Sequence, residues 1–285
     1  LVVLYQEAIK ESQVPDFFFF QRIQSIMLLS KICMLATSLL AFQATAFHST
    51  TGSPVRILSS NQHRGGVTLA STASSSETSI EEAQQILYRA AETKSEDSDK
   101  VVAALLDLEK AMRKKNKEDP SVADETLEAL AGNGGGSWRL IFTTGTVDTQ
   151  KKMGKINYFP IKATQSFNKG EDPWLIENGI YIGDFPVIKF KGDFDWTLQK
   201  SGVSKLTFDF TSIKILNFFD IQLKAGEAAN LGAKTGLGSE GNVELEKRGK
   251  RAFFNWISAD DKIATARGGG GGLAVWKRVD YEGGK

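Results

Sequence analysis

The residue types that carry most enzyme chemistry are scarce in this chain and lie near its N-terminus. The 285 residues contain one cysteine, Cys33, and two histidines, His48 and His63. The sequence beyond His63 therefore offers no thiol nucleophile, no Ser-His-Asp triad, no disulfide and no zinc site with His or Cys ligands. Chemistry that uses only Asp, Glu, Lys, Ser or Tyr is still compatible with the composition.

Two patterns in the remaining sequence imitate catalytic or phosphate sites. Asp193 and Asp195 share one face of an expected strand like paired carboxylates, but Lys189 and Lys191 on that face favour cross-strand ion pairs. A phosphate cradle at Gly268–Gly272 would need a helix N-terminus after it, and a strand follows instead, which indicates a flexible hairpin turn. We therefore predict no catalytic residue, no metal and no cofactor.

Charge gives no support for nucleic-acid binding. The net charge is +1 at pH 7, whereas nucleic-acid binders need a basic excess. One basic cluster, at residues 113–117, could touch anionic lipid headgroups. We favour the simpler interpretation, a solvated helix end at which cations complement the helix dipole.

The N-terminal region has the features of targeting sequence. Residues 27–46 have the layout of a secretory signal peptide, with an apolar run at 32–42 and a small-residue Ala-Thr-Ala at 44–46. The run is shorter than the about 20 residues that span a bilayer. A buried core helix is the less favoured alternative. Residues 1–26 are expected to be a non-native or disordered leader.

Residues 47–79 have the composition of a transit peptide. They are rich in Ser, Thr and Ala, and their first acidic residue is Glu77. The junction of Ala-Thr-Ala with Phe47 resembles the bipartite plastid presequence of algae with red-derived secondary plastids. This resemblance implies import into a plastid.

A small helical segment is predicted over residues 80–132. Ser79 and Glu82 have the spacing of a capping box, so the first helix should begin there. A second helix is expected from Asp99 to Lys115, with an apolar stripe along one face. A third, short helix should follow Asp119, its N-cap, and stop at Gly132.

Residues 133–285 change to the alternating pattern of β-strands. Apolar side chains share one face of each segment and polar side chains take the other. About eight strands and a short extra one near 262–266 are predicted: 137–146, 156–168, 174–183, 186–199, 203–212, 214–224, 251–258 and 273–279. The Gly/Ala-rich stretch 225–242 is expected to be a loop at the barrel mouth, either a lid over a ligand or a surface loop without a function.

Two ends of this β-rich region resemble the lipocalin superfamily. Gly136-Ser137-Trp138 opens the first strand and Arg278 closes the last. The resemblance implies that Trp138 plugs the closed end of an antiparallel barrel, with the Arg278 cation packed across its ring. An eight-stranded barrel can hold one small ligand. The side chains predicted to line its cavity are Phe142, Phe167, Phe190, Phe194, Trp196, Phe208 and Phe210.

A wider match covers about residues 80–280 and resembles the plastid lipid-associated, or fibrillin, family. Leu108-Glu109 lies in a helix before the strand 138–144, and Ala266-Arg267-Gly268 precedes the last strand. Further similar segments lie between them: 163–167, 190–194 and 206–210. Two departures are Lys115–Pro120, where the family commonly has Asn-Pro, and the five glycines at 268–272, where it tends to carry an acidic residue.

The resemblance implies a binding protein for hydrophobic plastid molecules such as carotenoids, quinones, tocopherols or fatty acids. It also implies residence at thylakoids or plastoglobules, and protein partners stay unknown. One alternative is a lipocalin-like enzyme that acts on a carotenoid or lipid; a de-epoxidase of that kind would be expected to carry several cysteines. The other alternative is a coat that covers lipid surfaces and encloses no ligand.

Overall fold

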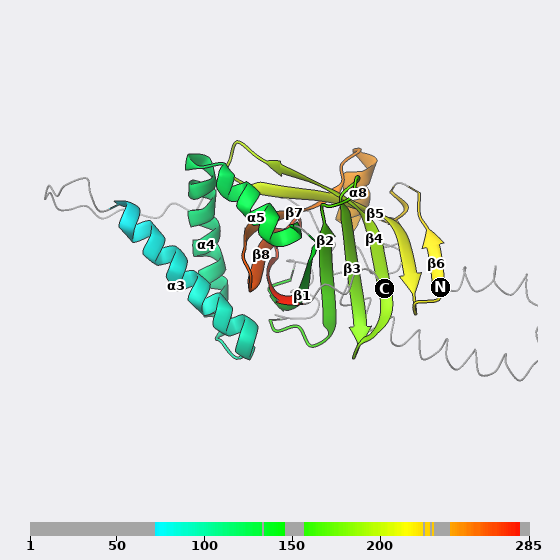
Figure 1. Cartoon of the computed structure of the whole chain (residues 1–285), viewed down its shortest axis with the longest axis horizontal. Helices are drawn as coiled ribbons and strands as arrows, with labels where there is room; N and C mark the ends of the chain where they lie inside the picture. Colours follow the sequence, from blue (N-terminus) through cyan, green and yellow to red (C-terminus); the bar gives the residue numbers. More distant parts are fainter. Residues whose placement is uncertain are drawn as a thin grey trace, which may run out of the picture.

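The molecule consists of a β-barrel with helices packed on its side and across one end (Figure 1). It was obtained as a computed structural model. The structure describes these residues: 72–132, 134–145, 157–224, 226–228, 230 and 240–279. The leader, the signal peptide and residues 47–71 of the predicted transit peptide lie outside them. No helix in the described part is both long and apolar enough to cross a membrane.

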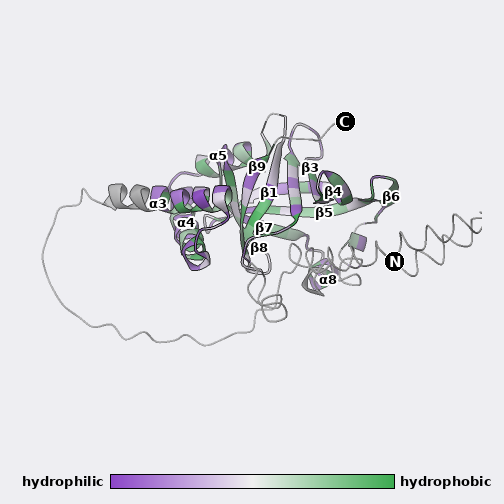
Figure 2. Ribbon diagram, turned by 90° about the horizontal axis from the view of Figure 1, so that it is seen from below, coloured by the Kyte–Doolittle hydropathy of each residue, from purple (hydrophilic) through white to green (hydrophobic). Residues whose placement is uncertain are grey.

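Alternating polar and apolar residues build the strands (Figure 2). The strands are β1 (Gly136–Thr143), β2 (Lys162–Asn168), β3 (Leu175–Ile182), β4 (Phe185–Leu198), β5 (Ser204–Ile215), β6 (Phe219–Gln222), β7 (Ala252–Ala259), β8 (Ile263–Gly268) and β9 (Leu273–Val279). All pairings are antiparallel, in the order β4-β3-β2-β1-β9-β8-β7-β5-β6.

Pairing of β4 with β5 closes eight of these strands into a barrel. The first part of β5 pairs with β7, from Ser204 opposite Trp256 to Phe208 opposite Ala252. Its last part pairs with β6, which therefore extends the sheet beyond the closed barrel. The prediction of a mainly β, lipocalin-like antiparallel barrel preceded by helices is confirmed.

The helices differ from the prediction mainly at the start. They are α3 (Thr72–Thr93), α4 (Ser98–Glu118), α5 (Ser121–Ala131) and, late in the chain, α8 (Glu240–Lys247). Because α3 begins at Thr72, the predicted capping box at Ser79 is wrong. The Asp97 carboxylate caps α4 by accepting from the backbone of Asp99 and Lys100. The expected loop 225–242 lies mostly outside the described residues, and α8 begins at its end.

Two strand boundaries also differ. The predicted strand 214–224 is a hairpin, because the chain turns at Leu216 and Asn217, whose φ angles are 51° and 62°. The predicted strand 156–168 begins at Lys162, and before it Tyr158 forms only an isolated bridge to Phe142.

Apolar residues form one core inside the barrel and a second outside it. The inner core extends from Trp138 and Trp276 at one end to Ile180, Ile188 and Ile213 at the other. The outer core joins α3 and α4 to the outward faces of β1, β7, β8 and β9. We call the end covered by α5 the closed end. The opposite end, at the β3–β4 and β5–β6 hairpins, is the mouth.

Candidate functional site

Six of the seven aromatic side chains predicted to line a cavity face the barrel interior. They belong to or pack against the inner clusters: Phe167, Phe190, Phe194, Trp196, Phe208 and Phe210. Phe190 and Phe210 are half-buried near the mouth, whereas Phe167 and Phe194 are buried toward the closed end. Three strands, β2, β4 and β5, thus bring residues that are distant in sequence onto one apolar surface.

The prediction for Phe142 is wrong. A register shift between Leu140 and Phe142, where β1 pairs with β9, turns Phe142 to the outer face of the barrel. There it belongs to the cluster under α3 and α4, and its ring meets that of Tyr158 edge-on at 5.4 Å. Phe142 therefore anchors helices and does not line the interior.

Ring contacts continue without a break from the closed end to the mouth. Successive centroids are 5.2 to 6.0 Å apart along one path: Trp276, Trp256, Phe254, Phe208, Phe210 and Phe190. The first three were not among the predicted site residues. Their spacing could have revealed them. Phe254 and Trp256 are two positions apart in β7, and Trp276 is two positions from Ala274 in β9, so each shares the inward face of its strand with another apolar residue.

A polar side chain lies within this aromatic surface. Gln165 of β2 is 0% exposed, and its neighbours on the same face, Ala163 and Phe167, belong to the inner cluster. Neither amide atom of Gln165 has a hydrogen-bond partner among the described residues, nor do the indole nitrogens of Trp256 and Trp276. The interior can therefore offer one acceptor and several donors to a polar group. Gln165 was not predicted as a site residue, although alternation within 163–167 could have placed it inward.

At the closed end, Arg278 packs across the ring of Trp138. The Arg278 guanidinium lies 5.2 Å from the centroid of the Trp138 ring, and Trp138 is 0% exposed. The indole Nε1 of Trp138 donates to the Leu130 carbonyl at 2.9 Å, and Arg278 donates to the carbonyl of Ala129. Helix α5 is thus joined to both members of the pair. The expected contact between the Arg278 cation and the Trp138 ring is present, and the barrel-closing role of the pair stays a prediction.

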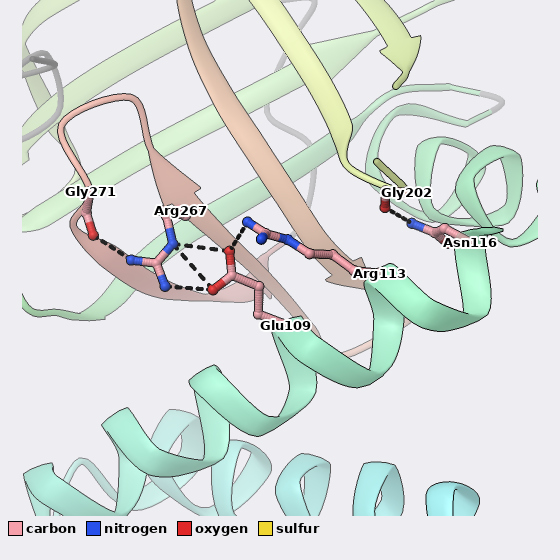
Figure 3. A network of polar contacts seen from close by, with 6 residues as sticks. All are labelled: Glu109, Arg113, Asn116, Gly202, Arg267 and Gly271. Atoms are coloured by element: carbon pink, nitrogen blue, oxygen red, sulfur yellow. Dashed lines mark hydrogen bonds and ion pairs between the residues drawn. The ribbon is translucent and has the colours of Figure 1, made fainter. Parts of the chain in front are cut away.

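An ion cluster around the buried carboxylate of Glu109 ties α4 to the β8–β9 hairpin (Figure 3). Arg267 contacts both carboxylate oxygens of Glu109, through Nε at 3.0 and 3.2 Å and through Nη2 at 2.5 Å. Arg113 donates to the same carboxylate at 2.6 Å. Burial raises the pKa of Glu109, but the two guanidinium groups outweigh it and hold that pKa below its ordinary value.

The end of α4 is fastened to the β4–β5 turn by a second contact (Figure 3). Asn116, which is buried, donates to the Gly202 carbonyl at 3.1 Å and to the Ser204 hydroxyl at 3.2 Å. Gly202 has a φ of 78°, and a Cβ there would lie 2.2 Å from the carbonyl oxygen of Arg113. Only glycine lets the turn approach the helix so closely.

The paired carboxylates form ion pairs, as predicted, although with another partner. Arg251 contacts Asp193 at 2.5 Å and Asp195 at 2.6 Å. Lys189 and Lys191 bind Glu177 of the neighbouring strand instead. In the described part of the chain, no group of three or more His, Cys, Asp or Glu side chains could hold a metal ion.

A cleft outside the barrel is a less suitable site. It has a volume of about 360 Å³ and lies between α3, α4, α5 and the end of β7. Apolar residues such as Ile80 and Met112 alternate around it with Glu81, Lys115 and Glu125. This mixed lining offers neither a continuous apolar surface nor a cluster of one charge.

The fold and the site define a lipocalin-like barrel with an aromatic interior and with helix α5 packed at one end. Comparisons of the chain with protein-family models, with curated proteins and with solved structures gave no match.

Proposed function

We propose that this protein is a carrier of the plastid lipid-associated type, which holds a hydrophobic molecule with a polar group inside its barrel. Carotenoids, quinones, tocopherols and fatty acids have this chemistry. The observation that carries the proposal is the unpartnered Gln165 amide within an aromatic interior. We propose binding and not catalysis, in keeping with the lack of Cys and His beyond His63.

The aromatic path supports the apolar half of this proposal. Phe190 and Phe210, half-buried near the mouth, would meet a ligand first. The rings of Phe208 and Phe254, stacked at 5.4 Å, continue the same surface inward. An elongated apolar molecule would gain about 25 cal/mol for each Å² of apolar surface that it removes from water.

The polar half depends on Gln165. An unsatisfied buried amide costs about 1–3 kcal/mol, so native proteins almost always provide such groups with partners. A hydroxyl, carbonyl or carboxyl group on the ligand could supply the partner, because Gln165 can both donate and accept. The indole N–H groups of Trp256 and Trp276 could serve the same ligand group as donors.

The proposed setting is the surface of thylakoids or plastoglobules. The resemblance to the fibrillin family supports it, and two segments that carry the resemblance meet in space: Glu109 of the Leu-Glu helix binds Arg267 of the Ala-Arg-Gly segment. The two segments, which are 158 positions apart at this contact, are therefore joined by an ion pair. Lipids and hydrophobic small molecules are the proposed partners, and nucleic acid is not among them.

The proposal is tested by replacing Gln165 with leucine. Gln165→Leu should weaken binding of a fluorescent polyene fatty acid about tenfold, the cost of about 1.4 kcal/mol for one lost polar contact. Binding of diphenylhexatriene, a hydrocarbon without a polar group, should not change. Fluorescence titration measures both affinities.

Two further variants make this test specific. Gln199→Leu, an exposed position in the β4–β5 turn, should leave both probes unaffected. Phe208→Trp should weaken both probes, because the larger ring would occupy part of the volume that the proposal assigns to the ligand. If neither probe binds the wild-type protein saturably, the carrier proposal fails and the coat alternative is preferred.

Plastid import is a separate prediction. Phe47 lies outside the described residues, at the junction of the predicted signal and transit peptides. Phe47→Ala in a fluorescent fusion of the full chain should block entry into the plastid, with the fusion held in an earlier compartment. His48→Ala should be imported normally. Microscopy that finds the Phe47→Ala fusion inside the plastid would contradict the bipartite presequence.

A further inference from the structure

Large exposed apolar side chains gather at the mouth of the barrel. The described residues include six exposed large hydrophobic side chains, and four of them lie at two hairpin tips: Ile182 (53% exposed), Phe185 (48%), Phe218 (81%) and Phe219 (62%). We call these four residues the apolar rim. Single exposed apolar residues are ordinary, but a group that includes three phenylalanines marks an interaction surface.

The two hairpin tips are neighbours. Ile182 and Phe185 face each other across the β3–β4 turn, while Phe219 pairs with Ile215 beside the β5–β6 turn. Pairing of β4 with β5 joins the two tips, and the Leu216 backbone N–H donates to the Val187 carbonyl at 2.8 Å. In Figure 1 the tips point to the lower edge of the view, away from α5. Both hairpins therefore present apolar side chains on the same end of the barrel.

Two ion pairs lie beside the apolar rim in the described part of the chain. Lys162 binds Asp184 at 2.8 Å in the β3–β4 turn, and Lys214 lies 3.7 Å from Asp220 next to Phe219. These two lysines of the described residues thus have acidic partners. An anionic surface would gain little from such a rim, so the charge pattern is complementary to an uncharged surface.

The rim also continues into the barrel. Behind it lie the mouth residues Ile180, Ile188 and Ile213, with the half-buried Phe190 packed against them. Phe190 begins the aromatic path that extends inward to Trp276. A lipid-soluble molecule could pass along this apolar surface from a lipid layer to the interior with little exposure to water. A protein partner would have no comparable use for this continuity.

We propose that the apolar rim inserts into the surface of an uncharged lipid layer and thereby places the mouth of the barrel against that layer. The phenyl rings would lie at the boundary between headgroups and acyl chains, as aromatic side chains do in interfacial proteins. The inference deepens the proposed function by naming the residues that contact the lipid surface and the charge of that surface. The purpose of docking rests on that function, but docking itself can be measured without any carried ligand.

Tryptophan placed at the rim reports insertion directly. Phe218→Trp in the full chain, mixed with phosphatidylcholine vesicles that contain brominated acyl chains, should show a blue-shifted emission component and strong quenching. Leu106→Trp is the matched control, because Leu106 is 47% exposed on α4, away from the mouth. It should be quenched no more than the wild-type protein. Equal quenching of the two variants would overturn the proposal.

Vesicle flotation tests the contribution of the rim and its charge. Phe218→Ser combined with Phe219→Ser should reduce rim-dependent partitioning about ten- to thirtyfold, because two phenyl rings lose apolar contact. Leu106→Ser should not change it. Addition of phosphatidylglycerol should leave the difference between the rim variant and the control unchanged. If the rim variant and the control differ in partitioning only when the anionic lipid is present, the proposal of an uncharged lipid partner is overturned.

Other occupants of the rim give a different result. If the rim instead joins two copies of the chain, the double serine variant should have a lower mass by light scattering than the wild type. Phe218→Trp should then not be quenched by brominated lipid. This pair of results would contradict the proposal. Quenching at residue 218 together with no binding of fatty acid probes would support docking and reject the carrier function. The two proposals can therefore fail separately.

Discussion

Trp138→Ala is expected to lower the free energy of unfolding by about 3–5 kcal/mol, the range for removing a fully buried large aromatic side chain. Trp138 is 0% exposed at the closed end, and its Nε1 donates to the Leu130 carbonyl. The substitution would leave a cavity and an unpaired carbonyl beneath α5. Urea unfolding followed by circular dichroism measures the loss.

The partner of this indole supplies the control. Arg278→Ala should cost about 1 kcal/mol, since Arg278 lies over the Trp138 ring and its side chain is partly in water. In a double-mutant cycle the two losses should not add, and the coupling should be about 0.5 kcal/mol or more. Additive losses would show that the cation and the ring do not stabilise each other, and would remove the energetic basis of the barrel-closing pair.

Alternation made the barrel predictable. The inner face of each strand meets aromatic side chains and the outer face meets water or helices, so the two-residue period is strong in segments such as 186–199 and 203–212. The period fails where the backbone departs from it. The register shift between Leu140 and Phe142 turns the Phe142 side chain to the outer face of the barrel, and the local residue types do not predict this shift.

Turns and helix starts were less predictable for a related reason. The β5–β6 turn uses left-handed backbone at Leu216 and Asn217 and contains no glycine, so the usual turn signal is weak there. Ser79 resembles an N-cap, yet α3 extends back to Thr72. A local capping pattern cannot exclude a helix that has already begun.

The candidate site was predictable where a local pattern marks it. Trp138 and Arg278 were found because they mark the first and last strands of a known type of barrel. Gln165 was missed because a polar residue at an inward position contradicts the hydrophobic pattern that identifies a core. The contact between Glu109 and Arg267 joins residues 158 positions apart, so it depends on how α4 packs against the barrel.

That contact leads to the second large effect. Arg267→Met should lower the free energy of unfolding by about 3 kcal/mol, the lower end of the range for breaking a buried ion pair from one side. The Glu109 side chain is only 9% exposed, whereas that of Arg267 is 24% exposed. Arg113 would still contact Glu109, which keeps the loss from being larger. Glu109→Met combined with Arg267→Met should recover most of the loss, because no buried charge is left unpaired.

The same cluster should make stability depend on pH in a defined direction. The pKa of Glu109 is lowered in the folded protein from an ordinary value of 4.5, because the arginines outweigh the effect of burial. A carboxyl group of this kind stabilises the fold above its unfolded pKa, and that contribution is lost as the pH falls through the folded value. The stability difference between the wild type and Glu109→Gln should therefore be largest near neutral pH and shrink below pH 4.5. Urea titrations at several pH values measure this difference, and a gap that stays constant on acidification would show that the charge of Glu109 does not hold α4 to the barrel.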